Sequence, residues 1–170
     1  MARSLVKRSD KVSFLGCVNE GTETFNRMRG FTTLSGSKNP TEYSRKYVDE
    51  EFETTDVTGY SPSLEFGFDQ YKEDPVHEEM VSILDGEKTG TDARRNIVTI
   101  DFSQPSGEEG SYKAVKREYA IIGDGDGDGT DAYTYSGTFR ATGSKVVGTA
   151  AVDETGAVAT FTADDSIDAF

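Results

Sequence analysis

The segment Ser63-Leu-Glu-Phe-Gly-Phe-Asp69 alternates large apolar residues with small or charged ones. Successive side chains of a β-strand point to opposite faces, so Leu64, Phe66 and Phe68 share one face while Glu65 lies on the other. This period of two is typical of a strand that is buried on one side only. The segment therefore predicts a half-buried strand in an antiparallel sheet.

The same pattern recurs on both sides of this segment. Its apolar positions are Val12, Phe14 and Val18; Val98, Ile100 and Phe102; Val115, Tyr119 and Ile121; and Tyr133, Tyr135 and Phe139. Two final strands, 145–152 and 157–163, flank Asp153-Glu-Thr-Gly156, a hairpin turn whose glycine suits a left-handed conformation. About eight such strands predict a mainly β fold, an antiparallel β-sandwich or barrel with one short α-helix.

That helix is predicted over residues 75–85. Asp74 is a suitable N-cap, Pro75 fits the first helical position, and Gly86 ends the helix as a C′ residue. The chain's one histidine, His77, is predicted to be exposed in the first turn. The apolar stripe of the helix consists of Val76, Met80, Ile83 and Leu84.

Residues 35–62 form a long early loop in this interpretation, because they show neither helical nor clean strand periodicity. A loop of this length in a compact domain is uncommon and is usually functional. The loop is rich in aromatic residues, which together with arginine are enriched in the cores of protein–protein interfaces. We predict an arm that docks on another subunit. Its inter-subunit contact residues are predicted to be Tyr43, Arg45, Tyr47, Phe52 and Tyr60.

The chain of 170 residues is expected to form a single domain, 1–170, with residues 1–10 as a flexible N-terminal arm. Charge is uneven: residues 1–50 carry nine basic and six acidic side chains, whereas residues 51–170 carry nine basic and 25 acidic ones. The net charge of −13 argues against a protein that grips nucleic acid through its phosphates. Its uneven distribution favours head-to-tail attraction between copies.

Few residues are suited to catalysis or to metal binding. Cys17 and His77 are each the one residue of their type, which excludes an intramolecular disulfide and a histidine-rich zinc site. No nucleotide-binding or hydrolase motif occurs, and paired carboxylates such as Glu78 and Glu79 are expected to be solvated. The sequence therefore predicts no enzyme activity and no cofactor. Without a secretory signal or a membrane-length apolar run, we expect the chain to fold in a cytoplasm.

The aspartate-rich stretch Gly123–Asp131 invites a different interpretation. Asp124, Asp126 and Asp128 have the spacing of a calcium-binding loop, but Tyr135 stands where a bidentate glutamate is required. We expect a solvated hairpin connection and no metal site. The alternative to a self-assembling protein is a carbohydrate- or calcium-binding β module on a particle or cell surface.

Several segments of the sequence are typical of one protein family. They are Arg27-Met-Arg-Gly-Phe-Thr-Thr-Leu-Ser-Gly-Ser-Lys-Asn-Pro-Thr-Glu-Tyr-Ser-Arg-Lys-Tyr-Val-Asp49, Glu53-Thr-Thr-Asp-Val-Thr-Gly-Tyr-Ser-Pro62, Phe66-Gly-Phe-Asp-Gln-Tyr71, Lys116-Arg-Glu-Tyr-Ala120 and Gly129-Thr-Asp-Ala-Tyr-Thr-Tyr-Ser-Gly-Thr-Phe139. Across residues 25–142 the chain resembles the major tail (tail tube) proteins of long-tailed, siphovirus-type bacteriophages of Gram-positive hosts.

The resemblance implies a β-sandwich-like fold with one helix and a homo-oligomer of hexameric rings that stack into a tube. DNA would pass through the lumen into the host without specific binding, and no membrane would be involved. Residues 35–62 would reach the next subunit or ring. Other tail proteins, such as the tape measure and the tail terminator, would be partners. The protein would be part of the virion, after assembly in the cytoplasm of the host bacterium.

Overall fold

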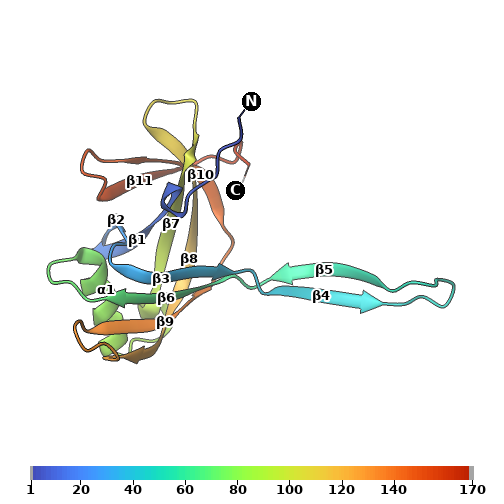
Figure 1. Ribbon diagram of the computed structural model, residues 1–170, viewed down its shortest axis with the longest axis horizontal. Coiled ribbons are helices and arrows are strands. Elements are labelled where there is room, and N and C mark those ends of the chain that lie inside the picture. Colours follow the sequence, from blue (N-terminus) through green and yellow to red (C-terminus); the bar gives the residue numbers. More distant parts are fainter. Residues whose placement is uncertain (1, 169–170) are drawn as a thin grey trace.

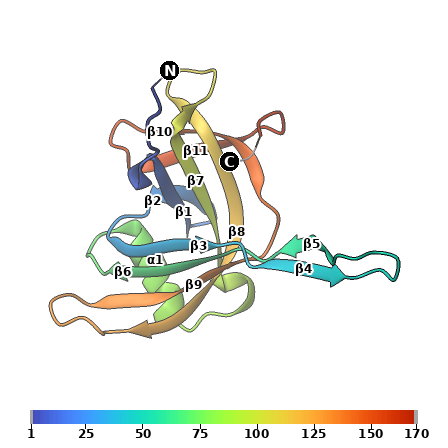
Figure 2. The same ribbon diagram turned by 45° about the vertical axis from the view of Figure 1, so that its right-hand side comes forward.

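The computed structural model describes residues 2–168 and consists mainly of antiparallel β-strands with one α-helix (Figure 1, Figure 2). The strands are β1 (Lys11–Asn19), β2 (Thr22–Arg27), β3 (Phe31–Ser37), β4 (Pro40–Arg45), β5 (Thr54–Tyr60), β6 (Ser63–Asp69), β7 (Arg94–Pro105), β8 (Ser111–Asp126), β9 (Thr134–Ala141), β10 (Val146–Val152) and β11 (Val158–Ala163). The helix α1 covers Pro75–Asp85, and two short 3-10 helices cover Arg8–Asp10 and Gly90–Ala93. The predicted mainly β fold is confirmed.

Six strands close into a barrel in the order β10-β11-β2-β1-β7-β8, because β8 pairs with β10 as well as with β7. The predicted hairpin turn between the last two strands is confirmed, with Gly156 at a φ of 71°. Three large side chains and three alanines fill the barrel, and the alanines suit its narrow interior. These buried residues are Phe14, Val98, Ile100, Ala114, Ala150 and Ala159.

Three more strands extend the sheet beyond β8 in the order β9-β6-β3. They can do so because β8 is long: its first half pairs with β10 and its second half pairs with β9. The extension packs on α1 around a second core, in which Phe66, Phe68 and Phe139 meet Met80 and Ile83 of the helix. The face predicted for Phe66 and Phe68 is therefore confirmed as a buried one.

The start of α1 agrees with its prediction. The Asp74 carboxylate accepts hydrogen bonds from the backbone N–H groups of Val76 and His77 at 3.0 and 3.2 Å. These bonds satisfy two of the donors that every helix leaves unpaired at its N-terminus. Pro75 occupies the first turn, where its missing N–H costs nothing.

The end of α1 differs slightly from its prediction. Gly86 is the C-cap residue with a right-handed φ of −76°, and it is Glu87 that takes the left-handed conformation, with a φ of 48°. Glycine is still required at position 86, because a Cβ there would lie 2.6 Å from the Ser82 carbonyl oxygen. The glycine thus serves a close approach of the backbone rather than a left-handed turn.

The prediction for His77 is wrong, because its side chain is completely buried. The imidazole stacks on Phe68 with ring centroids 4.7 Å apart. Its Nδ1 accepts a hydrogen bond from the Tyr71 backbone N–H at 3.0 Å, so Nε2 carries the proton and donates to the Arg29 carbonyl oxygen at 2.6 Å. The backbone passes over the ring at Gly30, whose φ of 72° favours glycine. A Cβ added at this position would lie only 3.0 Å from the Cε1 atom of the imidazole, which also favours glycine. These covering segments come from outside the helix, so the helical pattern does not predict the burial.

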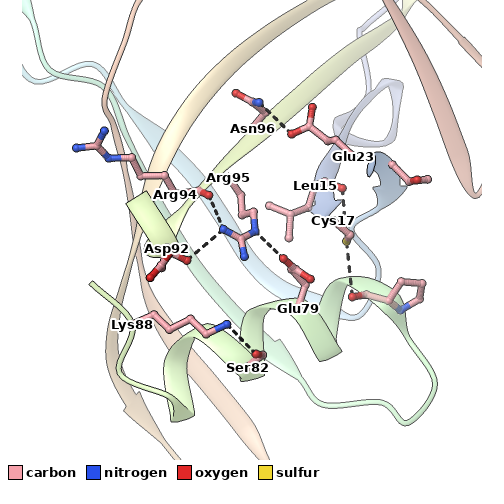
Figure 3. Close-up of polar contacts among 12 residues, drawn as sticks. Leu15, Cys17, Glu23, Glu79, Ser82, Lys88, Asp92, Arg94, Arg95 and Asn96 are labelled. Carbon is pink, nitrogen blue, oxygen red and sulfur yellow. Dashed lines mark hydrogen bonds and ion pairs between the residues drawn. The ribbon is translucent and has the colours of Figure 1, made fainter. Parts of the chain in front are cut away.

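Polar contacts also join α1 to the barrel (Figure 3). Arg95 of β7 donates from Nε to the Glu79 carboxylate at 2.6 Å, so Glu79 is half-buried and paired rather than solvated as predicted. The Cys17 thiol donates weakly to the carbonyl oxygens of Leu15 and Pro75, at 3.7 and 3.6 Å. Burial raises the pKa of the Cys17 thiol to about 11. The thiol is therefore protonated and unreactive at neutral pH.

Part of the predicted N-terminal arm, residues 1–10, has structure. Residues 2–7 are exposed and have no helix or strand, and Met1 lies outside the described residues. The Arg8 guanidinium donates to the carbonyl oxygens of Lys11 and Leu34 at 2.7 and 3.2 Å. Arg8 thereby ties the end of this segment to β1 and β3. The flexibility of the segment stays a prediction.

Asp101 of β7 is a buried carboxylate that the alternation pattern does not single out. It is 1% exposed, and it accepts hydrogen bonds from the Ser103 hydroxyl at 2.5 Å and from the Gln104 side-chain amide at 2.8 Å. The Lys11 ammonium lies 3.9 Å away. Burial acts to raise the pKa of Asp101, but the hydrogen bonds from Ser103 and Gln104 outweigh it and hold the pKa below the ordinary value of 3.8. These contacts stabilise the end of β7, where the pairing with β8 shifts between Asp101 and Pro105.

We expect the substitution Asp101→Asn to lower the free energy of unfolding by about 1–3 kcal/mol at pH 7, since it removes charged hydrogen bonds from a buried site. Because the folded-state pKa is depressed, the ionised carboxylate stabilises the fold above pH 3.8 and loses this effect as the pH falls through the folded-state pKa. The difference in urea unfolding between variant and wild type should therefore begin to shrink below about pH 4 and should disappear once the pH is below the folded-state pKa. Asp131→Asn, at an exposed position, is the control. An equal deficit at pH 7 and pH 3 would contradict this account.

Candidate assembly interface

Residues 35–62 are not the irregular loop that their sequence predicts. Strand β3 continues to Ser37, and β4 and β5 then pair with each other from Pro40 opposite Tyr60 to Arg45 opposite Thr54. These two strands form a sheet of their own, which projects far from the body of the molecule (Figure 1). We call residues 40–60 the arm. The arm has no apolar alternation because both of its faces are exposed along most of its length, so no core selects one face.

The root of the arm is fixed by Asn39. β3 and β6 remain paired up to Ser37 opposite Ser63, so the arm continues an existing hairpin after a kink. Asn39 takes a left-handed φ of 46° at this kink, a conformation that asparagine tolerates better than most residues. Its side-chain amide donates to the Ser61 carbonyl oxygen and the Ser63 hydroxyl, both at 3.0 Å. The root therefore sets the direction in which the arm leaves the body.

One face of the arm carries an ordered cluster around Arg45. The guanidinium carbon lies 5.1 Å from the ring centroid of Tyr43 and 5.4 Å from that of Tyr47. Arg45 Nε donates to the Tyr47 hydroxyl at 2.7 Å, and the guanidinium also forms an ion pair with Asp56 on the neighbouring strand. Side chains held in this way lose less conformational freedom when a partner binds. The structure thus brings together three of the five predicted contact residues.

The other two predicted residues lie at opposite ends of the arm. Phe52 lies in the connection between β4 and β5, residues 46–53, which we call the arm tip. Tyr60 ends β5 at the root. The four predicted aromatic residues expose between 48% and 78% of their surfaces; they are Tyr43, Tyr47, Phe52 and Tyr60.

Two further apolar residues of the arm are exposed, although the sequence does not predict them as contact residues. Val48 at the arm tip is fully exposed and Val57 is about half exposed. Isolated valines carry no interface signal in a sequence, although both stand among the aromatic residues of this segment. Exposed apolar side chains that gather on one part of a protein surface are typical of interaction sites. The contacts that the arm makes with a partner stay a prediction.

The aspartate-rich stretch is more regular than predicted. Strand β8 continues to Asp126, where it pairs with Tyr135, so the connection to β9 shortens to residues 127–133. The Tyr133 hydroxyl donates to Asp126 at 2.8 Å, and this hydrogen bond raises the pKa of Tyr133. Among residues 2–168 no three His, Cys, Asp or Glu side chains are grouped so that they could hold a metal ion. In the same part of the chain, every helix is too short or too polar to cross a membrane.

Comparisons with known proteins add little to this description. No protein-family model matches the chain, and neither does any curated protein. A solved structure that matches is a chain in the six-fold symmetrised cryo-EM structure of the anti-feeding prophage (AFP) baseplate. The two share 9% sequence identity with a TM-score of 0.42, over 81% of this chain and 89% of that chain.

Proposed function

We propose that this protein is a structural component of a bacteriophage tail that assembles with copies of itself into stacked hexameric rings, forming the tube through which DNA passes. The observation that carries the proposal is the arm, a two-stranded projection whose exposed aromatic and apolar residues have no core to pack on in a single copy. The expectation that the copies form rings and a tube comes from the resemblance of residues 25–142 to tail tube proteins. In this role the protein has no catalytic residues and needs no cofactor.

The charge distribution supports a conduit rather than a DNA-binding protein. Protein affinity for duplex DNA arises largely from lysine and arginine side chains that displace counterions from phosphates. This chain has 18 basic and 31 acidic side chains, so a tube built from it repels phosphates wherever its lumen is acidic. DNA then travels through the tube without adhering to the wall. Other tail proteins, such as a tape measure within the tube and a terminator at its end, complete the assembly in the virion.

We expect the purified full-length chain to form rings or tubes as its concentration rises, visible by negative-stain electron microscopy and by sedimentation. Assembly should slow at high salt, because the Debye length falls from about 10 Å at 0.1 M to about 3 Å at 1 M and attraction between exposed charges weakens accordingly. Assembled tubes should show no affinity for double-stranded DNA, even at low salt.

Two results would overturn the proposal. A chain that stays monomeric at every concentration, also when other tail proteins are added, does not build a tube. Tight, salt-sensitive binding of duplex DNA to the assembled protein would exclude a passive conduit and favour a packaging role. Calcium-dependent binding of a carbohydrate by a monomer would support the alternative of a surface-binding β module.

A further inference from the structure

A hollow of about 520 Å³ lies at the root of the arm. Its walls come from four separate parts of the chain. They are the arm root with Lys38 and Tyr60, β7 with Ile97 and Thr99, the face of β8 with Arg117 and Tyr119, and the connection between β9 and β10 with Lys145. This volume falls in the range of cavities that accept a drug-sized group. The hollow is thus large enough for a few side chains of another protein.

The floor of the hollow continues the apolar face of the sheet. Val115, Arg117 and Tyr119 alternate along β8 and share one face, and Arg117 stands opposite Ile97 of β7 in the strand register. Nearer to α1 this face is covered by the helix and is part of the core. Toward the arm it is only partly covered, and the basic residues of the hollow begin there.

The three cations of the hollow lack acidic partners. Within residues 2–168 no carboxylate forms an ion pair with Lys38, Arg117 or Lys145. Arg117 interacts with the Tyr119 hydroxyl, but its Nε is buried without a hydrogen-bond partner in the described chain. A buried donor without an acceptor is costly. The Arg117 side chain lines the hollow, where its positive charge adds to those of Lys38 and Lys145. In a chain with a net charge of −13, this basic hollow is suited to an acidic ligand.

The arm tip has the complementary chemistry. Within residues 46–53 it carries four carboxylates and one lysine, together with two exposed apolar side chains, Val48 and Phe52. The acidic residues are Asp49, Glu50, Glu51 and Glu53. Carboxylates match the basic walls of the hollow, and an aromatic ring matches its apolar floor.

The arm tip cannot fill the hollow of its own chain. The hollow is at the root of the arm, whereas the tip is at the far end of the projecting hairpin (Figure 1). We infer that the acidic arm tip of one copy binds the basic hollow at the arm root of the next copy. This inference rests on the proposed self-assembly and names the two surfaces that meet. Because tip and hollow are different surfaces, the contact is heterologous and repeats from copy to copy, as rings and tubes require.

Charge reversal on each side tests the contact. The hollow variant carries Lys38→Glu and Lys145→Glu, and the tip variant carries Glu51→Lys and Glu53→Lys; all four residues are exposed, so both chains should fold. We expect each variant to raise the concentration needed for assembly, measured by sedimentation velocity, by about tenfold or more, because like charges then face each other.

An equimolar mixture of the two variants should assemble again. The unchanged tip of the hollow variant fits the unchanged hollow of the tip variant, and the reversed tip likewise fits the reversed hollow. Damage to the fold of either chain cannot produce such a rescue. Two matched controls, Lys72→Glu with Lys88→Glu and Glu108→Lys with Glu109→Lys, reverse exposed charges elsewhere and should leave the assembly concentration within about twofold of wild type.

The outcomes separate the two proposals. If the wild-type chain does not assemble, the proposed function fails. If the wild type and both reversal variants assemble alike, the function stands and the contact between tip and hollow is wrong. If each variant is impaired but the mixture is not rescued, tip and hollow bind other surfaces and the inference is likewise overturned.

Discussion

A chain in which two glycines replace the arm, residues 40–60, is expected to fold normally and to remain monomeric at every concentration. The shortened chain should keep its fold and lose only its assembly, because the arm makes a sheet of its own and contributes no residue to either buried core. The cut ends lie close together: the Ser61 backbone N–H donates to the carbonyl oxygens of Lys38 and Asn39 at 3.2 and 3.3 Å. A two-residue glycine turn is therefore able to close the β3–β6 hairpin.

Circular dichroism and urea unfolding measure the fold of the shortened chain, and sedimentation velocity with electron microscopy measures its assembly. The control is the unshortened chain with Glu108→Lys and Glu109→Lys, which changes exposed residues outside the arm and should still assemble. Loss of the β signal on shortening would mean that the arm is part of the folding unit. Rings or tubes formed by the shortened chain would mean that the interface lies elsewhere.

The arm also shows how far the sequence alone predicts a site. Its aromatic residues and arginine pointed to an interface, because those residue types are enriched where proteins meet. Its strands were not predicted, since the period of two comes from burying one face and the arm buries neither. The half-buried strands of the body, such as the one with Phe66 and Phe68, carry that period and were predicted correctly.

The hollow at the arm root illustrates the limit more sharply. Along β8 the residues that share a face are Val115, Arg117, Tyr119 and Ile121, so a charged residue interrupts an otherwise apolar row. That interruption is a signal in the sequence, but its meaning depends on Lys38 and Lys145, which only the fold brings beside it. Residues from three distant segments leave no spacing that a sequence pattern detects.

Burial of His77 is a second case in which tertiary contacts override the local pattern, and it leads to a large expected effect on stability. The substitution His77→Ala should lower the free energy of unfolding by about 3 kcal/mol or more. The variant loses the ring that stacks on Phe68 and leaves a cavity in its place. It also leaves the Tyr71 N–H and the Arg29 carbonyl oxygen without their partner in a partly buried setting.

Urea unfolding measures the loss, and amide hydrogen exchange locates it, since the Tyr71 amide should exchange faster once its acceptor is gone. The control is Glu78→Ala at the next helix position, which is exposed and should change stability by no more than about 0.5 kcal/mol. Wild-type stability in His77→Ala would show that solvent or repacking replaces the ring at no cost. Because the arm is remote from α1, the folded variant should still assemble at low temperature, which separates a residue that holds the body together from those that join one copy to the next.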